Sequence, residues 1–220
     1  MPRRLAAGIV AAGIVAGAAS AATVAPERRE IRAADQALAR RANLRRGDVP
    51  AGLRVVAHLK NPFGPPLACR SFHPDLSDLT VTGEAASPVY GRAGLGMYST
   101  VRLYRSVHDE RADWSRTNSG VGVACGAKEI AAQRLAKMKV IVRKYALRPG
   151  PRLGDRTLVV RYTCFLVTGG RRLNLWVDVA SVARGRGEAT LVYTSYGRRP
   201  RAARELWLLA KLAKRLRAAE

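Results

Sequence analysis

The residues best suited to chemistry lie in one ten-residue segment, Cys69 to Asp78, with the sequence CRSFHPDLSD. It holds one cysteine, one histidine and two aspartates, and all of these side chains can bind a metal ion. Their spacing fits no compact zinc pattern, and the sequence offers no second pair of ligands to complete such a site. We therefore expect a solvated loop here, with no metal and no cofactor.

A nucleophile activated by a base is the other chemistry to consider. The chain has no Gly-x-Ser-x-Gly elbow, no His-Glu-x-x-His pair and no glycine-rich phosphate loop. His58, His73 and His108 could each act as a base, but none has a partner nearby in the sequence. Cys164 lies in the middle of a predicted strand, where a buried, unreactive thiol is expected. We predict no catalytic residues and no enzyme, and keep a hydrolase without a recognisable motif as the second alternative function.

The first 21 residues have the three parts of a secretory signal. Met1 to Arg4 is short and basic, Leu5 to Ala18 is uncharged and apolar, and Ala19-Ser20-Ala21 satisfies the small-x-small rule for cleavage. The apolar run is shorter than the ~20 residues that a membrane-spanning helix needs. We expect cleavage after Ala21 and a secreted or extracytoplasmic protein of the cell envelope, with a retained membrane anchor as the alternative.

The remaining chain divides into a leader, residues 22–43, and one domain, residues 44–220. The leader has a helix-forming composition but a narrow apolar stripe, which predicts a surface helix or a partly ordered segment. The rest is long enough to bury a sizeable core as a single α+β domain.

The domain is organised around three β-rich runs between Thr157 and Tyr196. Apolar and polar residues alternate along these runs, which predicts strands. Gly169-Gly170 and the pair Gly185 and Gly187 supply tight turns, so the three strands should form an antiparallel meander. Further strands are predicted at 53–60, 79–90, 95–106 and 139–147. The predicted fold class is therefore α+β, with an antiparallel β-sheet of about 6–7 strands.

Helices are expected in three places in this domain. The motif from Ser106 to Asp109 is a capping box, which predicts a helix to about Arg116. A second helix is predicted from Cys125 to Lys137, and a C-terminal helix follows Pro200, because leucines then recur at helical spacing. We expect the helices, including the C-terminal helix, to pack on one face of the sheet, because an apolar sheet face needs a cover.

The order of several short motifs resembles that of a known group of proteins. Those motifs are Asp48-Val49-Pro50, Cys69, Asp78-Leu79-Thr80, Cys125, Leu153-Gly154-Asp155 and Gly185-Arg186-Gly187. The order resembles uncharacterised exported actinobacterial proteins related to the extracellular sensor domain of PknH-type receptor kinases, with Mog1/PsbP/LpqN-like folds. The resemblance covers most of residues 44–217 and implies a sensor-like domain with a non-enzymatic binding or sensing role. It names no ligand, and it differs in one respect: those sensor domains use two disulfides, which three cysteines cannot form.

One disulfide is predicted, between Cys69 and Cys125. Both cysteines fall near the ends of predicted elements, where bridging geometry is easily reached, and an exported chain lies where disulfides persist. Cys164 is mid-strand and should remain a free thiol.

An exported binding or sensing module of unknown ligand is the leading function. A cleft between a sheet and its helices is a usual place for a ligand. Tyr162, Trp176 and Tyr196 are candidates for the rim of such a cleft.

The charge of the chain supports the first alternative function. The sequence has 39 lysine and arginine residues against 16 acidic ones, a formal net charge of +23. Only seven of the 39 are lysine and the arginines are spread along the chain, so we expect no specific nucleic acid partner. An exported basic protein would instead meet anionic cell-envelope polymer or lipid headgroups. Candidate contacts are Arg204, Lys211, Lys214 and Arg215. The sequence leaves the oligomeric state open, and we assume a monomer.

Overall fold

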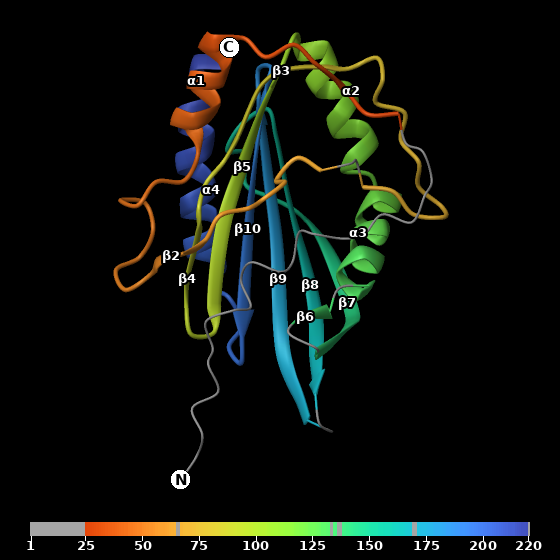
Figure 1. The fold of residues 1–220 in the computed structure, drawn as a ribbon, viewed down its shortest axis with the longest axis vertical. Coiled ribbons are helices and arrows are strands. Elements are labelled where there is room, and N and C mark those ends of the chain that lie inside the picture. The colour runs from red at the N-terminus through yellow and green to blue at the C-terminus, as the bar shows by residue number, and fades with distance from the viewer. Residues whose placement is uncertain (1–24, 65–66, 133, 136–137, 169–170, 220) are drawn as a thin grey trace.

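The computed structural model describes residues 25–64, 67–132, 134–135, 138–168 and 171–219 (Figure 1). The predicted signal peptide and the predicted Gly169-Gly170 turn lie outside these residues. None of the helices in the described part of the chain is long and apolar enough to cross a membrane.

Ten strands of the described chain form one mixed sheet, and the fold class α+β is confirmed. The order across the sheet is β1-β3-β5-β10-β9-β8-β7-β6, and β4 pairs with both β5 and β2. Only β1 and β3 are parallel among these pairs. The strands are β1 (Arg28–Arg29), β2 (Arg54–Ala57), β3 (Thr80–Ala86), β4 (Val89–Arg92), β5 (Leu95–Tyr104), β6 (Arg134–Leu135), β7 (Met138–Pro149), β8 (Arg156–Thr168), β9 (Arg171–Arg184) and β10 (Gly187–Tyr196).

The strand count exceeds the expected six or seven for two local reasons. The run expected as one strand at 79–90 is divided at Ser87-Pro88 into β3 and β4, because proline has no N–H to donate to a ladder. The other additions, β1 and β6, are two-residue edge strands. The predicted meander is present as β8, β9 and β10, and Gly185 at the β9–β10 turn has the positive φ of 55° that such a turn needs.

The helices cover both faces of the sheet, which corrects the expectation of a single covered face (Figure 1). Alternate residues of β10 are buried on opposite sides: Leu191 packs with α1 and α4, whereas Val192 packs with α3. Because both faces of the central strands are apolar, both need a cover. The helices are α1 (Ala33–Ala42), α2 (Val107–Thr117), α3 (Gly120–Ala132) and α4 (Ala202–Leu216), and a 3-10 turn (Arg217–Ala219) follows.

The leader is part of the fold. Leu38, Ala39 and Ala42 of α1 are buried in the core cluster that also contains the leucines of α4. Asp35 receives two hydrogen bonds from the Arg186 guanidinium, at 2.8 and 2.6 Å, so α1 is fastened to the β9–β10 turn. The described part of the leader is therefore an ordered component of the same core.

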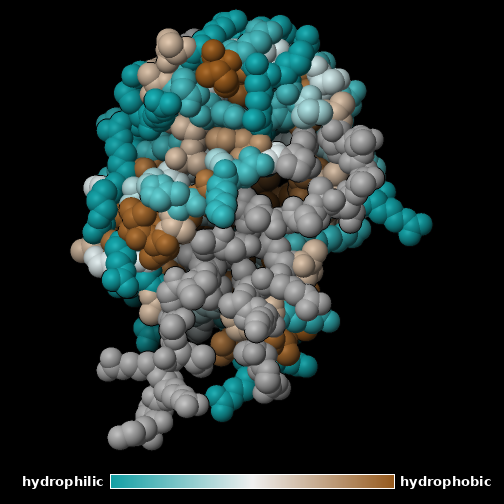
Figure 2. All heavy atoms as spheres, in the orientation of Figure 1, coloured by the Kyte–Doolittle hydropathy of each residue, from teal (hydrophilic) through white to brown (hydrophobic). Residues whose placement is uncertain are grey.

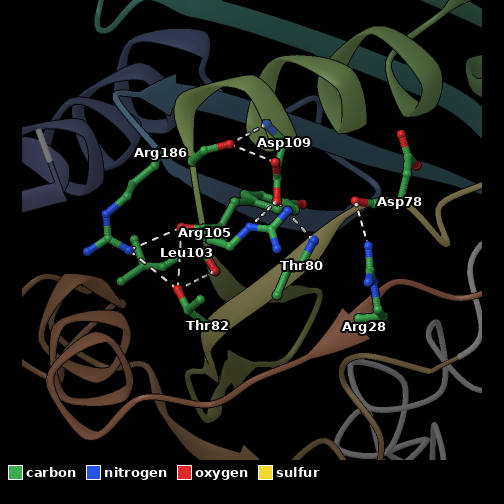
Figure 3. A network of polar contacts seen from close by, with 10 residues as sticks. Arg28, Asp78, Thr80, Thr82, Leu103, Arg105, Asp109 and Arg186 are labelled. Atoms are coloured by element: carbon green, nitrogen blue, oxygen red, sulfur yellow. Dashed lines mark hydrogen bonds and ion pairs between the residues drawn. The ribbon is translucent and has the colours of Figure 1, made fainter.

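A polar network ties α2 to the end of the sheet (Figure 3). The backbone N–H of Asp109 donates to Ser106 Oγ at 3.0 Å, which confirms the predicted helix start. The Asp109 carboxylate in turn accepts from the backbone N–H of Thr80 at 3.1 Å and lies 3.8 Å from Arg105. Asp109, in the first turn of α2, therefore fixes this helix against β3.

A buried ion pair lies beneath α4 on the other face. Arg161 of β8 and Asp178 of β9 are direct cross-strand neighbours, and the arginine donates two hydrogen bonds to the aspartate. Asp178 is fully buried. Glu205 of α4 lies 3.7 Å from the same guanidinium, so the three groups form one network.

Candidate ligand-binding cavity

A cavity of about 470 Å³ lies on the α2 and α3 side of the sheet. Its floor is formed by β5, β8, β9 and β10, and its walls by α2 and α3. The segment between β2 and β3, residues 58–79, contributes Asn61–Gly64, Leu67, Ala68 and Leu76 to the lining, and we call it the cover segment. The cavity is therefore bounded by three parts of the chain that are distant in sequence.

A disulfide joins the cover segment to α3. Cys69 and Cys125 are bonded, with Cα atoms 5.8 Å apart, as predicted from the sequence. The next residue, Gly126, has no room for a side chain, because an added Cβ would lie 2.8 Å from the Tyr162 hydroxyl oxygen. That hydroxyl donates to the Val123 carbonyl at 3.2 Å, so α3 rests directly on β8 and the disulfide holds the cover segment against it.

Cys164 is the free thiol among the described cysteines, and it is fully buried beneath this cavity wall. Burial raises its pKa to about 12. A thiol in this state is a poor nucleophile, in agreement with its prediction as structural.

A row of charged residues crosses this face of the sheet, and two of its members, Arg102 and Glu188, line the cavity. Glu84 of β3, Arg102 of β5 and Glu188 of β10 lie directly opposite one another in the strand register. Ala183 of β9 and Arg156 of β8 continue the same row. Because cross-strand partners share a face, all of these side chains belong to the cavity side of the sheet.

The charge of Arg102 is compensated by an acid outside this row. Its guanidinium forms an ion pair with Glu27 at 3.0 Å and lies over the Phe63 ring, 5.3 Å from the ring centroid. Phe63 belongs to the cover segment, so Arg102 also holds that segment over the floor.

Glu188 lines the cavity without a direct partner. Its carboxyl group forms no hydrogen bond and no ion pair with the residues that the structure describes. Burial, and then the charges of Asp113 and Glu110, raise its pKa to about 8, although Arg102 and Arg156 oppose the rise. This carboxyl group can therefore gain or lose a proton near neutral pH.

Two acidic residues of α2 lie near Glu188, and one of them, Asp113, lines the cavity. Asp113 accepts a 2.8 Å hydrogen bond from the Tyr104 hydroxyl, and burial raises its pKa. Glu110 is bonded to Arg156, yet burial still raises its pKa to about 7. Three carboxyl groups line the cavity, those of Asp113, Glu129 and Glu188, against one guanidinium group, that of Arg102, which makes this lining acidic in a strongly basic protein. Three more acids lie beside the arginines of the charge row, outside the lining: Glu27, Glu84 and Glu110.

The three predicted rim residues are not brought together. Tyr162 lines the cavity. Tyr196 lies on the same face but outside the lining, and its buried hydroxyl has no partner in the described chain. Tyr162 pairs with Val177, and the next pair along the two strands is Thr163 with Trp176. Because successive residues of a strand point to opposite faces, Trp176 lies on the face opposite to Tyr162. Strand alternation alone separates Trp176 from a site that contains Tyr162.

The four basic residues predicted to contact an anionic surface differ in their surroundings. Arg215 donates to Asp48 at 2.8 and 2.7 Å, and Lys211 lies 3.3 Å from the same carboxylate, so both fasten α4 to the segment before β2. Arg204 and Lys214 are exposed. Figure 2 shows a mainly hydrophilic surface in this view, with hydrophobic residues in small separate groups.

The segment considered for metal binding is held by an ion pair. Asp78 accepts two hydrogen bonds from Arg116, at 2.5 and 2.8 Å, which lower its pKa to about 2. His58, His73 and His108 are all exposed. In the part of the chain that the structure describes, no three metal-binding side chains come together.

The sequence did not identify Glu84, Arg102 and Glu188 as neighbours in one row, two members of which line the cavity. Each is the single charged residue of its strand, among apolar and hydroxyl neighbours. A lone charge within a strand of this kind is the sequence feature that could have marked these residues. Their meeting depends on strand order and register, which local patterns do not contain.

Comparisons with known proteins add no family. A scan against protein-family models found no match to this chain, and a search of curated proteins found none either.

Proposed function

We propose that the protein is an exported, non-enzymatic binding module that holds a small molecule in the cavity between the sheet, α3 and the cover segment. The observation that carries this proposal is the cavity itself, whose volume of about 470 Å³ lies within the range of small-molecule sites. Its lining is largely apolar with a few convergent polar groups, which is the usual composition of such sites.

The polar groups favour a ligand with a cationic group. Glu188 has no partner within the described chain, whereas Arg102 is already paired with Glu27. An ammonium group beside Glu188 would supply the missing hydrogen-bond donors and stabilise the charged carboxylate. The neighbouring Asp113 would add to the attraction.

The apolar groups favour an aliphatic or aromatic body on that ligand. Tyr98, Val177, Val179 and Val192 line the floor beside the charge row, and Ile130 lines the α3 wall. A molecule with an amine at one end and an apolar body at the other fits both parts of the lining.

A binding role is favoured over hydrolysis by the residue types around the cavity. Its described lining contains threonine, tyrosine, carboxyl and guanidinium groups, but no serine, cysteine or histidine. A hydrolase of the nucleophile–base type would need such a pair within hydrogen-bond reach. The three exposed histidines lie outside this lining.

Export, with cleavage after Ala21, is part of the proposal. The Cys69–Cys125 disulfide supports it, because disulfides persist mainly in oxidising compartments.

The proposal is tested by thermal unfolding in the presence of paired ligands of equal chain length, alkylamines and alkyl carboxylates. A ligand that binds the folded state raises the melting temperature, and the rise grows with the logarithm of the ligand concentration relative to its Kd. We expect the amines to stabilise the protein and the matched carboxylates to have little effect.

Two variants sharpen this test. Thr100→Phe places a large side chain on the cavity floor and should abolish stabilisation by every ligand, while Glu188→Gln should weaken the preference for amines, because Asp113 and Glu129 remain in the lining. Glu30→Gln, an exposed position outside the cavity, is the matched control and should behave as the unchanged protein. Stabilisation that persists in Thr100→Phe would place the ligand elsewhere and refute the proposal.

A further inference from the structure

One part of the α4 side of the sheet is not covered by helices. In Figure 1, β7, β8 and β9 extend beyond α4 toward the lower end of the view. Phe165 of β8 pairs there with Ile141 of β7 and Asn174 of β9, so these three side chains share a face. Ile141 and Asn174 are exposed, and Phe165 is half-buried. This face is opposite to the ligand-binding cavity.

Four exposed basic residues lie on the uncovered face: Lys139, Arg143, Lys144 and Arg172. The strand register puts Lys139 opposite Val167, Lys144 opposite Thr163 and Arg172 opposite Val167, on the Phe165 side. None of the four forms an ion pair with a described residue. We call this group the basic strip.

The strands that carry the strip are almost free of acidic residues. Together β7, β8 and β9 contain nine basic residues and one acidic residue, Asp178. That aspartate is buried and bonded to Arg161, so it does not reduce the positive potential at the surface. The charge of the strip is therefore uncompensated by its own strands.

The aromatic ring at the centre of the strip positions two of the charges. The Arg143 guanidinium lies 4.9 Å from the centroid of Phe165, and the Arg172 guanidinium lies 5.9 Å from the same centroid. Stacking of this kind restrains a guanidinium group and leaves its N–H donors free for other partners. It also covers the Phe165 ring, which reduces the apolar surface that could enter a lipid bilayer.

We propose that the basic strip binds a linear polyanion of the cell envelope that carries phosphate groups along its chain. Guanidinium groups bind phosphate oxygens in a bidentate manner, and lysines add point charges. Neighbouring strands are ~4.8 Å apart and alternate residues of one strand ~7 Å apart, so the strip presents charges at intervals suited to successive phosphates. The cell envelope is named as the source of this polyanion because of the proposed export. The strip itself does not depend on export.

The test compares two variants with the same loss of charge. The strip variant carries Lys139→Gln, Arg143→Gln, Lys144→Gln and Arg172→Gln. The control variant carries glutamine at four exposed arginines near the start of α4: Arg198, Arg199, Arg201 and Arg204. Affinity of the purified full-length chain for long-chain inorganic polyphosphate is measured at several salt concentrations.

We expect the strip variant to lose about tenfold or more in affinity at low salt and the control variant to lose much less. Binding by the unchanged protein should weaken steeply with salt, because it depends on the release of counterions. The salt dependence of the strip variant should be shallower, because it makes fewer phosphate contacts.

Three results would overturn the proposal. Equal losses in the two variants would mean that the net charge acts as a whole and that no strip exists. Tighter binding of single-stranded DNA than of polyphosphate, at equal phosphate concentration, would indicate base stacking on Trp176 and a nucleic acid partner. Strong binding to anionic phospholipid vesicles that survives high salt, without binding to polyphosphate, would identify a membrane surface instead.

Discussion

Arg102 and Glu188 lie directly opposite each other on β5 and β10, but they do not form an ion pair. The guanidinium instead binds Glu27, 3.0 Å away, and lies over Phe63. This arrangement leaves the Glu188 carboxyl group at the cavity without a partner in the described chain. The same arginine therefore holds the cover segment in place and leaves an acid available for a ligand.

The first prediction concerns stability as a function of pH. The pKa of Glu188 is raised to about 8 in the folded protein, so the folded state retains a proton that the unfolded chain releases near pH 4.5. The contribution of Glu188 to the free energy of unfolding is therefore fully present below about pH 4.5. It falls as the pH rises toward 8, by up to about 1.4 kcal/mol per pH unit for one such group. Glu188→Gln mimics the protonated acid and should be more stable than the unchanged protein at pH 8, but equal to it at pH 5.

Urea unfolding at a series of pH values measures this difference. Glu110 and Glu205, whose pKa values are raised to about 7 and about 8, act in the same direction and should leave some pH dependence in the variant. The exposed Glu30→Gln should not change the profile. Destabilisation by Glu188→Gln at pH 8 would show that the charged carboxylate is stabilised in the folded state, contrary to this account.

The second prediction concerns protons released on ligand binding. At pH 7 Glu188 is mainly protonated in the empty cavity, because its pKa is raised to about 8. An amine that pairs with the carboxylate must therefore displace this proton, and its affinity should increase with pH up to about 8 and then level off. Calorimetry in buffers of different ionisation enthalpy measures the proton directly. An affinity that falls between pH 6 and pH 8 would exclude an ammonium–carboxylate contact at Glu188.

The third prediction concerns the buried ion pair beneath α4. Arg161→Met would leave Asp178 buried without its partner and should cost about 3–5 kcal/mol of stability. Adding Asp178→Leu and Glu205→Leu should recover most of the loss, because no member of the buried network is then left without a partner.

Arg116→Met is the matched control for this prediction. Arg116 also donates two hydrogen bonds to an aspartate, Asp78, but that side chain is 57% exposed. Exposed pairs contribute about 0–1 kcal/mol, so the loss should be small. Equal losses for Arg161→Met and Arg116→Met in denaturant unfolding would contradict the role assigned to burial.

The fourth prediction concerns the cysteines. Without reductant, the folded protein should show no thiol that reacts with a thiol reagent, because Cys164 is buried and its pKa is raised to about 12. Denaturant should expose one thiol, and denaturant with reductant should expose three. Replacing Cys69 and Cys125 with serine should cost about 4 kcal/mol, given the 56-residue separation. Three reactive thiols in denaturant alone would mean that the disulfide is absent.

The fifth prediction concerns the amino terminus that the proposed export would produce. Cleavage after Ala21 gives a mature chain that begins at Ala22, and the mass of the intact secreted protein checks this to one residue. Recovery of the chain with Met1 from the cytoplasm would contradict the proposed compartment, although it would leave the cavity unaffected.

The sequence alone determined the local features of this fold. Alternation and turn glycines identified β8, β9 and β10, the capping box identified the start of α2, and leucine spacing identified α4. These features depend on residues close together in the chain, which is why they can be read from it. The pairing of Cys69 with Cys125 was also predicted correctly, because Cys164 lies within a strand.

Only the tertiary structure decided which residues share a site. Trp176 and Tyr162 both belong to the predicted meander, yet register and alternation place them on opposite faces. Glu84, Arg102 and Glu188 come from three strands that are distant in sequence, and the strand order β3-β5-β10 brings them into one row. Strand order and register are set by packing across the whole core, and a one-residue shift would move each side chain to the other face. For the same reason the covered cavity and the uncovered basic strip could be assigned to their faces only once the positions of α3 and α4 were known.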